Sequence, residues 1–87
     1  MAPYNPPMNR HYSQLNVSSY DKNVILFMIG KQGKGFYHLT NYLAIDYLWY
    51  NNDKKIIELW GSENVLKDGA VNKLKEAIEA NVRLLSD

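Results

Sequence analysis

Three features are missing from this sequence, and each absence excludes a class of protein. There is no cysteine, which excludes disulfide frameworks, thiolate zinc sites, iron–sulfur clusters and cysteine nucleophiles. The longest purely apolar run, residues 24–29, is far shorter than the roughly 20 residues that a membrane-spanning helix requires. The first residues also lack the basic-then-apolar layout of a secretory signal. We therefore expect an intracellular protein, nuclear or cytoplasmic, that does not contact a membrane.

An excess of charge of one sign is also missing. Ten Lys and Arg residues stand against nine Asp and Glu residues, which gives a formal net charge of +1. That balance is too small for unspecific attraction to a polyanion, so nucleic-acid binding would have to come from local placement of cations. The content of hydrophobic residues, 46%, is typical of a folded domain and not of a disordered chain.

The length of 87 residues is enough for one domain, because a chain of this size cannot divide its buried surface between two cores. All three prolines lie near the start of the chain, where apolar periodicity is absent, so residues 1–10 are predicted to be a flexible tail. Residues 11–87 then form the single domain.

The first half of the domain is predicted to contain one strand and two helices. Residues 11–17 alternate between apolar and polar side chains, as a half-buried strand does. Ser18 and Ser19 offer N-cap oxygens for a short helix that ends at Gly30. A second helix follows over residues 36–43, where apolar residues recur at spacings of three and four.

The second half is predicted to contain a hairpin and a long helix. Residues 45–50 and 55–60 are rich in aromatic and branched side chains and flank a turn-forming cluster, so they form an antiparallel hairpin. Ser62 is a candidate N-cap for a C-terminal helix whose apolar spacing continues over residues 66–85. Gly69 weakens that helix by about 1 kcal/mol relative to alanine.

This order, strand-helix-helix-strand-strand-helix, predicts an α+β fold in which a three-stranded antiparallel sheet has three helices on one face. Tyr47 and Trp49 share a strand face with Ile45, so at least one face of that strand should be core. The residues expected to be buried are Phe36, Leu39, Ile45, Leu74 and Ile78.

The glycine-rich segment between the first two predicted helices does not fit the common nucleotide-binding loops. A Walker loop needs a lysine and a hydroxyl residue directly after its last glycine, but Phe36 and Tyr37 occupy those positions. A dinucleotide-binding loop needs a third glycine at the G-x-G-x-x-G spacing, which is absent after Gly35. A tight helix-to-helix turn that binds nothing remains an open interpretation.

The same segment resembles a different family. Ile29-Gly30-Lys31-Gln32-Gly33, followed at three-residue spacing by Phe36 and Leu39, is similar to the I-G-x-x-G-x-x-I-x-x-I core of the KH domain, whose GXXG loop clamps a nucleic-acid backbone. The predicted order of elements also looks like the type I, eukaryotic-type KH arrangement. The resemblance covers about residues 12–85.

The resemblance implies a site for short single-stranded nucleic acid, RNA in preference to DNA. The loop glycines would let backbone amides approach a phosphate, and the basic residues of the loop would add charge. Ile29 would form one wall of a groove, and a central strand near residues 47–49 would form the other. Lys55 would reach the ligand across the groove, and Tyr37 is our candidate aromatic contact. The predicted binding residues are therefore Ile29, Gly30, Lys31, Gln32, Gly33, Lys34, Tyr37 and Lys55.

Catalysis is not expected. His11 and His38 lie 27 residues apart without a third metal ligand or a nucleophile–base set in a recognisable motif. We therefore expect no catalytic residues, no bound metal and no cofactor. The alternative function is a KH-shaped protein-interaction or homodimerisation module that uses the sheet edge or the C-terminal helix and binds no nucleic acid.

Overall fold

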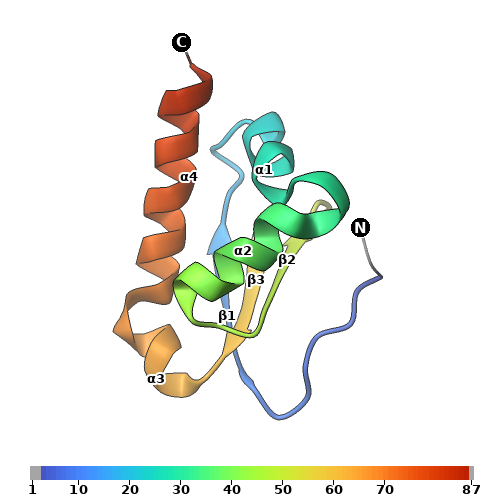
Figure 1. The fold of residues 1–87 in the computed structure, drawn as a ribbon, viewed down its shortest axis with the longest axis vertical. Helices are drawn as coiled ribbons and strands as arrows, with labels where there is room; N and C mark the ends of the chain where they lie inside the picture. The colour runs from blue at the N-terminus through green and yellow to red at the C-terminus, as the bar shows by residue number, and fades with distance from the viewer. Residues whose placement is uncertain (1–2, 87) are drawn as a thin grey trace.

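The computed structural model describes residues 3–86 and arranges them as a layer of helices over one sheet (Figure 1). In chain order the elements are β1 (His11–Asn16), α1 (Lys22–Ile29), the 3-10 turn η1 (Lys31–Gly33), α2 (Lys34–Leu43), β2 (Tyr47–Asn51), β3 (Ile56–Gly61), α3 (Glu63–Val65), the π-helical turn η2 (Leu66–Ala70) and α4 (Val71–Leu85). The predicted α+β class, with its three-stranded antiparallel sheet and three main helices, is confirmed. Met1, Ala2 and Asp87, which the predicted tail and domain include, lie outside the described residues.

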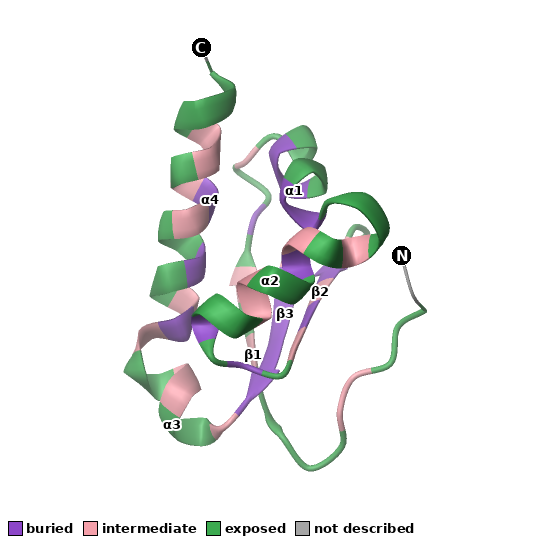
Figure 2. Cartoon of the chain, in the orientation of Figure 1, coloured by how far each residue is buried: buried purple, intermediate pink, exposed green. Residues whose placement is uncertain are grey.

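The central strand of the sheet is β3, because the strand order is β1-β3-β2. Leu48 of β2 lies opposite Leu59 and Tyr50 lies opposite Ile57, and all four side chains belong to the buried core. Figure 2 shows β3 as buried, and only its first residue, Ile56, is partly exposed. The expectation that residues 47–49 lie on a central strand is wrong, since β1 pairs with the second strand of the hairpin and leaves β2 at an edge.

The core contains four of the five residues expected there. Phe36, Ile45, Leu74 and Ile78 are buried, whereas Leu39 is only partly buried. Leu39 packs against the core from the surface, where it lines a shallow groove with residues of α1 and α4. The prediction for Leu39 was wrong because the helical period places a residue on a face of α2 but does not tell how far neighbouring helices cover that face.

Helix α1 begins and ends on local signals. The Asp21 carboxylate caps its start by accepting a hydrogen bond of 2.8 Å from the Asn23 N–H, so the predicted caps, Ser18 and Ser19, are not used. At its other end Gly30 adopts a φ of 73° and donates its N–H to the Leu26 carbonyl, as a glycine C-cap does. The predicted end of this helix at Gly30 is confirmed.

The close contact between α1 and α2 depends on Gly35. A Cβ atom built at this position would lie 2.0 Å from the Met28 carbonyl oxygen and 3.0 Å from that of Ile29. The first turn of α2 therefore lies directly against the last carbonyls of α1. No side chain fits between them, which explains why a third glycine follows the GXXG sequence.

The single C-terminal helix predicted over residues 66–85 is interrupted. Gly69 has a φ of 104°, outside the helical region, and α4 starts only at Val71. The predicted N-cap at Ser62 is present, since its Oγ accepts a hydrogen bond of 3.3 Å from Val65 N–H, but it caps the short α3. Gly69 was expected to weaken one continuous helix. In the structure it interrupts that helix, and the chain changes direction between α3 and α4.

Tyr4 lies on the outer face of the sheet, the face turned away from the helices. Its ring meets Trp49 and Trp60 edge-on, with ring centroids 4.8 Å and 5.9 Å apart. Its hydroxyl donates a hydrogen bond of 2.9 Å to the carboxylate of Glu58, which is only 7% exposed. Burial, followed by the hydrogen bond to Glu58, raises the pKa of Tyr4 to about 12.

A second contact holds the same N-terminal segment. The Asn5 N–H donates a hydrogen bond of 3.0 Å to the hydroxyl of Tyr47 in β2. We call residues 4–10 the N-terminal strap. The described part of the tail predicted over residues 1–10 is therefore not detached from the domain, because it contacts side chains of β2 and β3.

Candidate nucleic-acid interface

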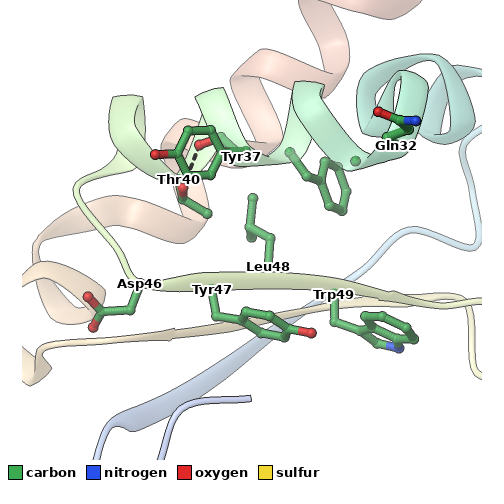
Figure 3. A pocket seen from close by; sticks show the side chains of 9 residues that line it. Gln32, Tyr37, Thr40, Asp46, Tyr47, Leu48 and Trp49 are labelled. Carbon is green, nitrogen blue, oxygen red and sulfur yellow. Dashed lines mark hydrogen bonds between the residues drawn. The ribbon is translucent and has the colours of Figure 1, made fainter. Parts of the chain in front are cut away.

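A groove of about 260 Å³ lies between α2 and β2 (Figure 3). Both walls come from segments that are adjacent in the fold, since α2 leads through a short loop into the edge strand β2. The residues that line it are Gln32, Gly33, Phe36, Tyr37, Thr40, Asp46, Tyr47, Leu48 and Trp49.

The helix wall is formed by side chains from one face of α2. Thr40 follows Tyr37 by three residues and Phe36 by four, and both spacings place side chains along one face of a helix. Phe36 is buried and Tyr37 is 66% exposed. The groove therefore has an apolar floor, with the phenol ring of Tyr37 available at its rim.

The strand wall is formed by Leu48 and by backbone. Figure 3 shows the Leu48 side chain directed toward α2, whereas Tyr47 and Trp49 project to the opposite side of the strand. Because β2 pairs with β3 on one side alone, the edge of β2 has backbone N–H and C=O groups without a strand partner in the described chain. This wall offers hydrogen-bond donors and acceptors that do not depend on side-chain identity.

The glycine loop lies at one end of the groove. Gly30, Gln32 and Gly33 have φ values of 73°, 58° and 78°, so three of the four loop residues have a positive φ. For Gln32 this conformation costs about 1 kcal/mol because of its Cβ atom. The loop leads into the N-terminus of α2, where the helix dipole favours a negative group.

The structure brings most of the predicted binding residues together. Gln32, Gly33 and Tyr37 line the groove. Gly30, Lys31 and Lys34 belong to the same loop or the first turn of α2, and both lysines are exposed. No ion pair involves either lysine within residues 3–86.

Two predicted residues lie elsewhere. Ile29 is 8% exposed and belongs to the core, so it anchors the start of the loop and does not line the groove. Lys55 lies in the hairpin turn before β3, with a φ of 57°, and donates from Nζ to Asn52 Oδ1 at 2.9 Å. It is not among the residues that line the groove.

Sequence reasoning missed a polar residue at the far end of the groove. Asp46 precedes β2 and forms an ion pair through Oδ2 with Nε of Arg10 in the N-terminal strap. The two residues are 36 positions apart, and no local pattern links them. Thr40 was also missed as a lining residue, although its spacing from Phe36 places both on one helix face.

The histidines remain separate. His11 lies 3.4 Å from Glu63 through Nε2, and the His38 ring lies beside that of Tyr37. Among residues 3–86, no three His, Asp or Glu side chains are grouped closely enough to hold a metal ion.

No family model, curated protein or solved structure matches this chain. In the described part of the chain, no helix combines the length and apolar character needed to cross a membrane.

Proposed function

We propose that the protein is a KH-like domain that binds short single-stranded nucleic acid, RNA in preference to DNA, in the α2–β2 groove and without catalysis. The observation that carries this proposal is the position of the glycine loop. It opens directly onto an apolar groove that an edge strand closes on the other side.

Each part of the groove matches one part of a single strand. The loop amides and the positive end of α2 suit a phosphate, with Lys31 and Lys34 adding charge. Bases fit against the apolar floor of Phe36 and Leu48, and Tyr37 offers a ring for stacking, which contributes about 1–3 kcal/mol per base in single-strand binders. A duplex hides its base faces, so it should bind less tightly.

A charge reversal in the loop tests the proposal. Changing Lys31→Asp and Gln32→Asp together places two carboxylates where the phosphate would lie. Because hydrogen bonds to charged groups contribute about 1.5–3 kcal/mol, affinity for a labelled single-stranded RNA should fall at least about tenfold. Undiminished binding by the folded double variant would move the site away from this loop.

A matched control is available on the outer face of α4. Asn72→Asp with Lys75→Asp makes the same change in net charge at two exposed positions far along the chain from the loop. This control should bind as the unmodified protein does. Equal losses in both double variants would show a general charge effect instead of a groove.

A protein-interaction or dimerisation module is the second candidate, and exposed apolar side chains at the end of α4 favour it. Leu84 and Leu85 are 65% and 44% exposed. Such a module would self-associate in sedimentation experiments, would lose that association on Leu84→Ser with Leu85→Ser, and would show no binding to single strands at near-physiological salt.

A further inference from the structure

We infer that Arg10 of the N-terminal strap is a second phosphate contact, at the end of the groove opposite the glycine loop. The inference rests on the proposed function, because it concerns the same groove and the same ligand. The ligand chemistry that it names is the phosphate backbone of a single strand.

The fold places Arg10 at the groove. Arg10 directly precedes β1, whose first residue pairs with Gly61, the last residue of β3. Asp46 reaches the same end of the sheet, since its N–H donates a hydrogen bond of 2.9 Å to the Trp60 carbonyl. Arg10 is not itself a lining residue, but its ion pair with Asp46 places it directly beside the lining residue at the end of the groove where β2 begins.

The glycine loop and this ion pair lie at opposite ends. Figure 3 shows Gln32 above the Trp49 end of β2, and Thr40 above the Asp46 end. Thr40 lies seven positions after Gly33, which precedes α2, so the two ends are about 10 Å apart at a helical rise of about 1.5 Å per residue. Two phosphate contacts at this separation would hold a strand along the groove, whereas the loop alone would hold it at one point.

The guanidinium of Arg10 has donors left for a phosphate. Its Nε donates to Asp46, while its two terminal NH₂ groups have no hydrogen-bond partner within residues 3–86. Those two groups form a planar pair that matches two oxygens of a phosphate. The side chains of Arg10 and Asp46 are 39% and 45% exposed, so the free edge is accessible.

The ion pair also offsets the negative charge that Asp46 brings to the groove. Asp46 is the charged side chain among the lining residues, and an unpaired carboxylate there would repel a phosphate backbone. Arg10 neutralises it. Because both side chains are exposed, the ion pair contributes no more than about 1 kcal/mol to the stability of the fold. Its effect on the charge of the groove is therefore the more important one.

The strap holds Arg10 in place before any ligand arrives. Tyr4 is fixed by Glu58 and the two tryptophans, and Asn5 is fixed by Tyr47. Because the segment is already ordered at its other end, less conformational entropy is lost when Arg10 contacts a ligand.

The test compares salt dependence among variants. For single strands the logarithmic salt slope changes by about 0.7 per neutralised phosphate, so Lys31, Lys34 and Arg10 together give about −2. In an Asp46→Asn background, which leaves no unpaired carboxylate at the groove, Arg10→Ala should lower affinity for a labelled single-stranded RNA about threefold to tenfold and reduce the slope to about −1.4. Arg10→Lys should keep the slope, because it keeps the charge, but lose part of the affinity, because it loses the planar pair of donors.

Arg83→Ala is the matched control, since Arg83 is an exposed arginine of α4 and should change neither affinity nor slope. Unchanged affinity and slope in Arg10→Ala, alongside a large loss in the Lys31→Asp, Gln32→Asp variant, would overturn the inference and leave the proposed function standing. No binding by the unmodified protein would overturn both. Circular dichroism melts of each variant verify that the fold is intact.

Discussion

The contact between Tyr4 and Glu58 gives the sharpest test of how the N-terminal strap is held. The Tyr4 hydroxyl donates to a carboxylate that is buried on the outer face of the sheet, at a distance of 2.9 Å. Replacing Tyr4 with Phe removes this hydrogen bond and keeps the ring against Trp49 and Trp60. Glu58 then keeps its hydrogen bond of 3.2 Å from the Asn51 amide and loses the other.

The expected magnitude follows from exposure. Hydrogen bonds to charged groups contribute about 1.5–3 kcal/mol when well buried, and Tyr4 is 48% exposed, so we take about 1–1.5 kcal/mol for Tyr4→Phe. Tyr4→Ala also loses two edge-on aromatic contacts, each contributing about 0.5–1.5 kcal/mol. The total loss for Tyr4→Ala is therefore about 2–4.5 kcal/mol.

Urea unfolding followed by circular dichroism measures both variants. A double-mutant cycle with Glu58→Gln isolates the coupling between hydroxyl and carboxylate, and Tyr42→Phe is the control because Tyr42 is 65% exposed. A free energy of unfolding for Tyr4→Phe within about 0.3 kcal/mol of the unmodified protein, together with zero coupling in the cycle, would refute the argument.

Three further predictions concern the interior and alkaline pH. Gly35→Ala should destabilise the protein by more than about 3 kcal/mol, because its Cβ would lie 2.0 Å from the Met28 carbonyl oxygen; a melting temperature equal to that of the unmodified protein would contradict this. Leu74→Ala should cost about 2–5 kcal/mol in urea unfolding, since Leu74 is fully buried, and a smaller loss would show that the core collapses around the site. Because the pKa of Tyr4 is raised to about 12 from its ordinary value near 10, its stabilisation is complete below about pH 10 and is lost as the pH rises through about 12; Tyr4→Phe should reduce the alkaline loss measured by unfolding at stepped pH, and the part due to Tyr12 and Tyr20, whose pKa values burial also raises, should remain.

Local patterns in the sequence predicted most of the secondary structure. The spacing of Leu74 and Ile78 requires a helix that buries one face, and the alternation in the hairpin requires strands. The loop was located correctly because positive φ values at Gly30 and Gly33 favour glycine over residues with a Cβ atom. These features depend on residues within a few positions of one another.

Predictions were wrong where two local signals competed. Ser18, Ser19 and Asp21 are all good N-caps, and their sequence does not say which one the path of the chain from β1 will place at the helix start. Gly69 is compatible with a weakened helix or with a break. The structure has the break, since α4 packs against β1 and α1 in a direction that α3 does not share.

The candidate groove shows the same division. Period-two alternation in β2 separates Tyr47 and Trp49 from Leu48 and Tyr50, but both sets are apolar enough to be core. The helices cover the face of β2 that carries Leu48, and the strap covers the face that carries Trp49. The backbone of β2 therefore lines the groove, while its two outer aromatic rings hold the strap.

By itself, then, the sequence determined the elements, their order and the position of the glycine loop, because hydrophobic period and backbone preference act over short distances along the chain. The tertiary structure alone decided that Arg10 meets Asp46 and that Tyr4 meets Glu58, pairs separated by 36 and 54 positions. In an unfolded chain each of these polar groups is satisfied by water, so nothing in their spacing favours one partner over another. They meet because β1 and β2 both pair with β3, so the strap that precedes β1 crosses the outer face of the same sheet whose edge strand lines the groove.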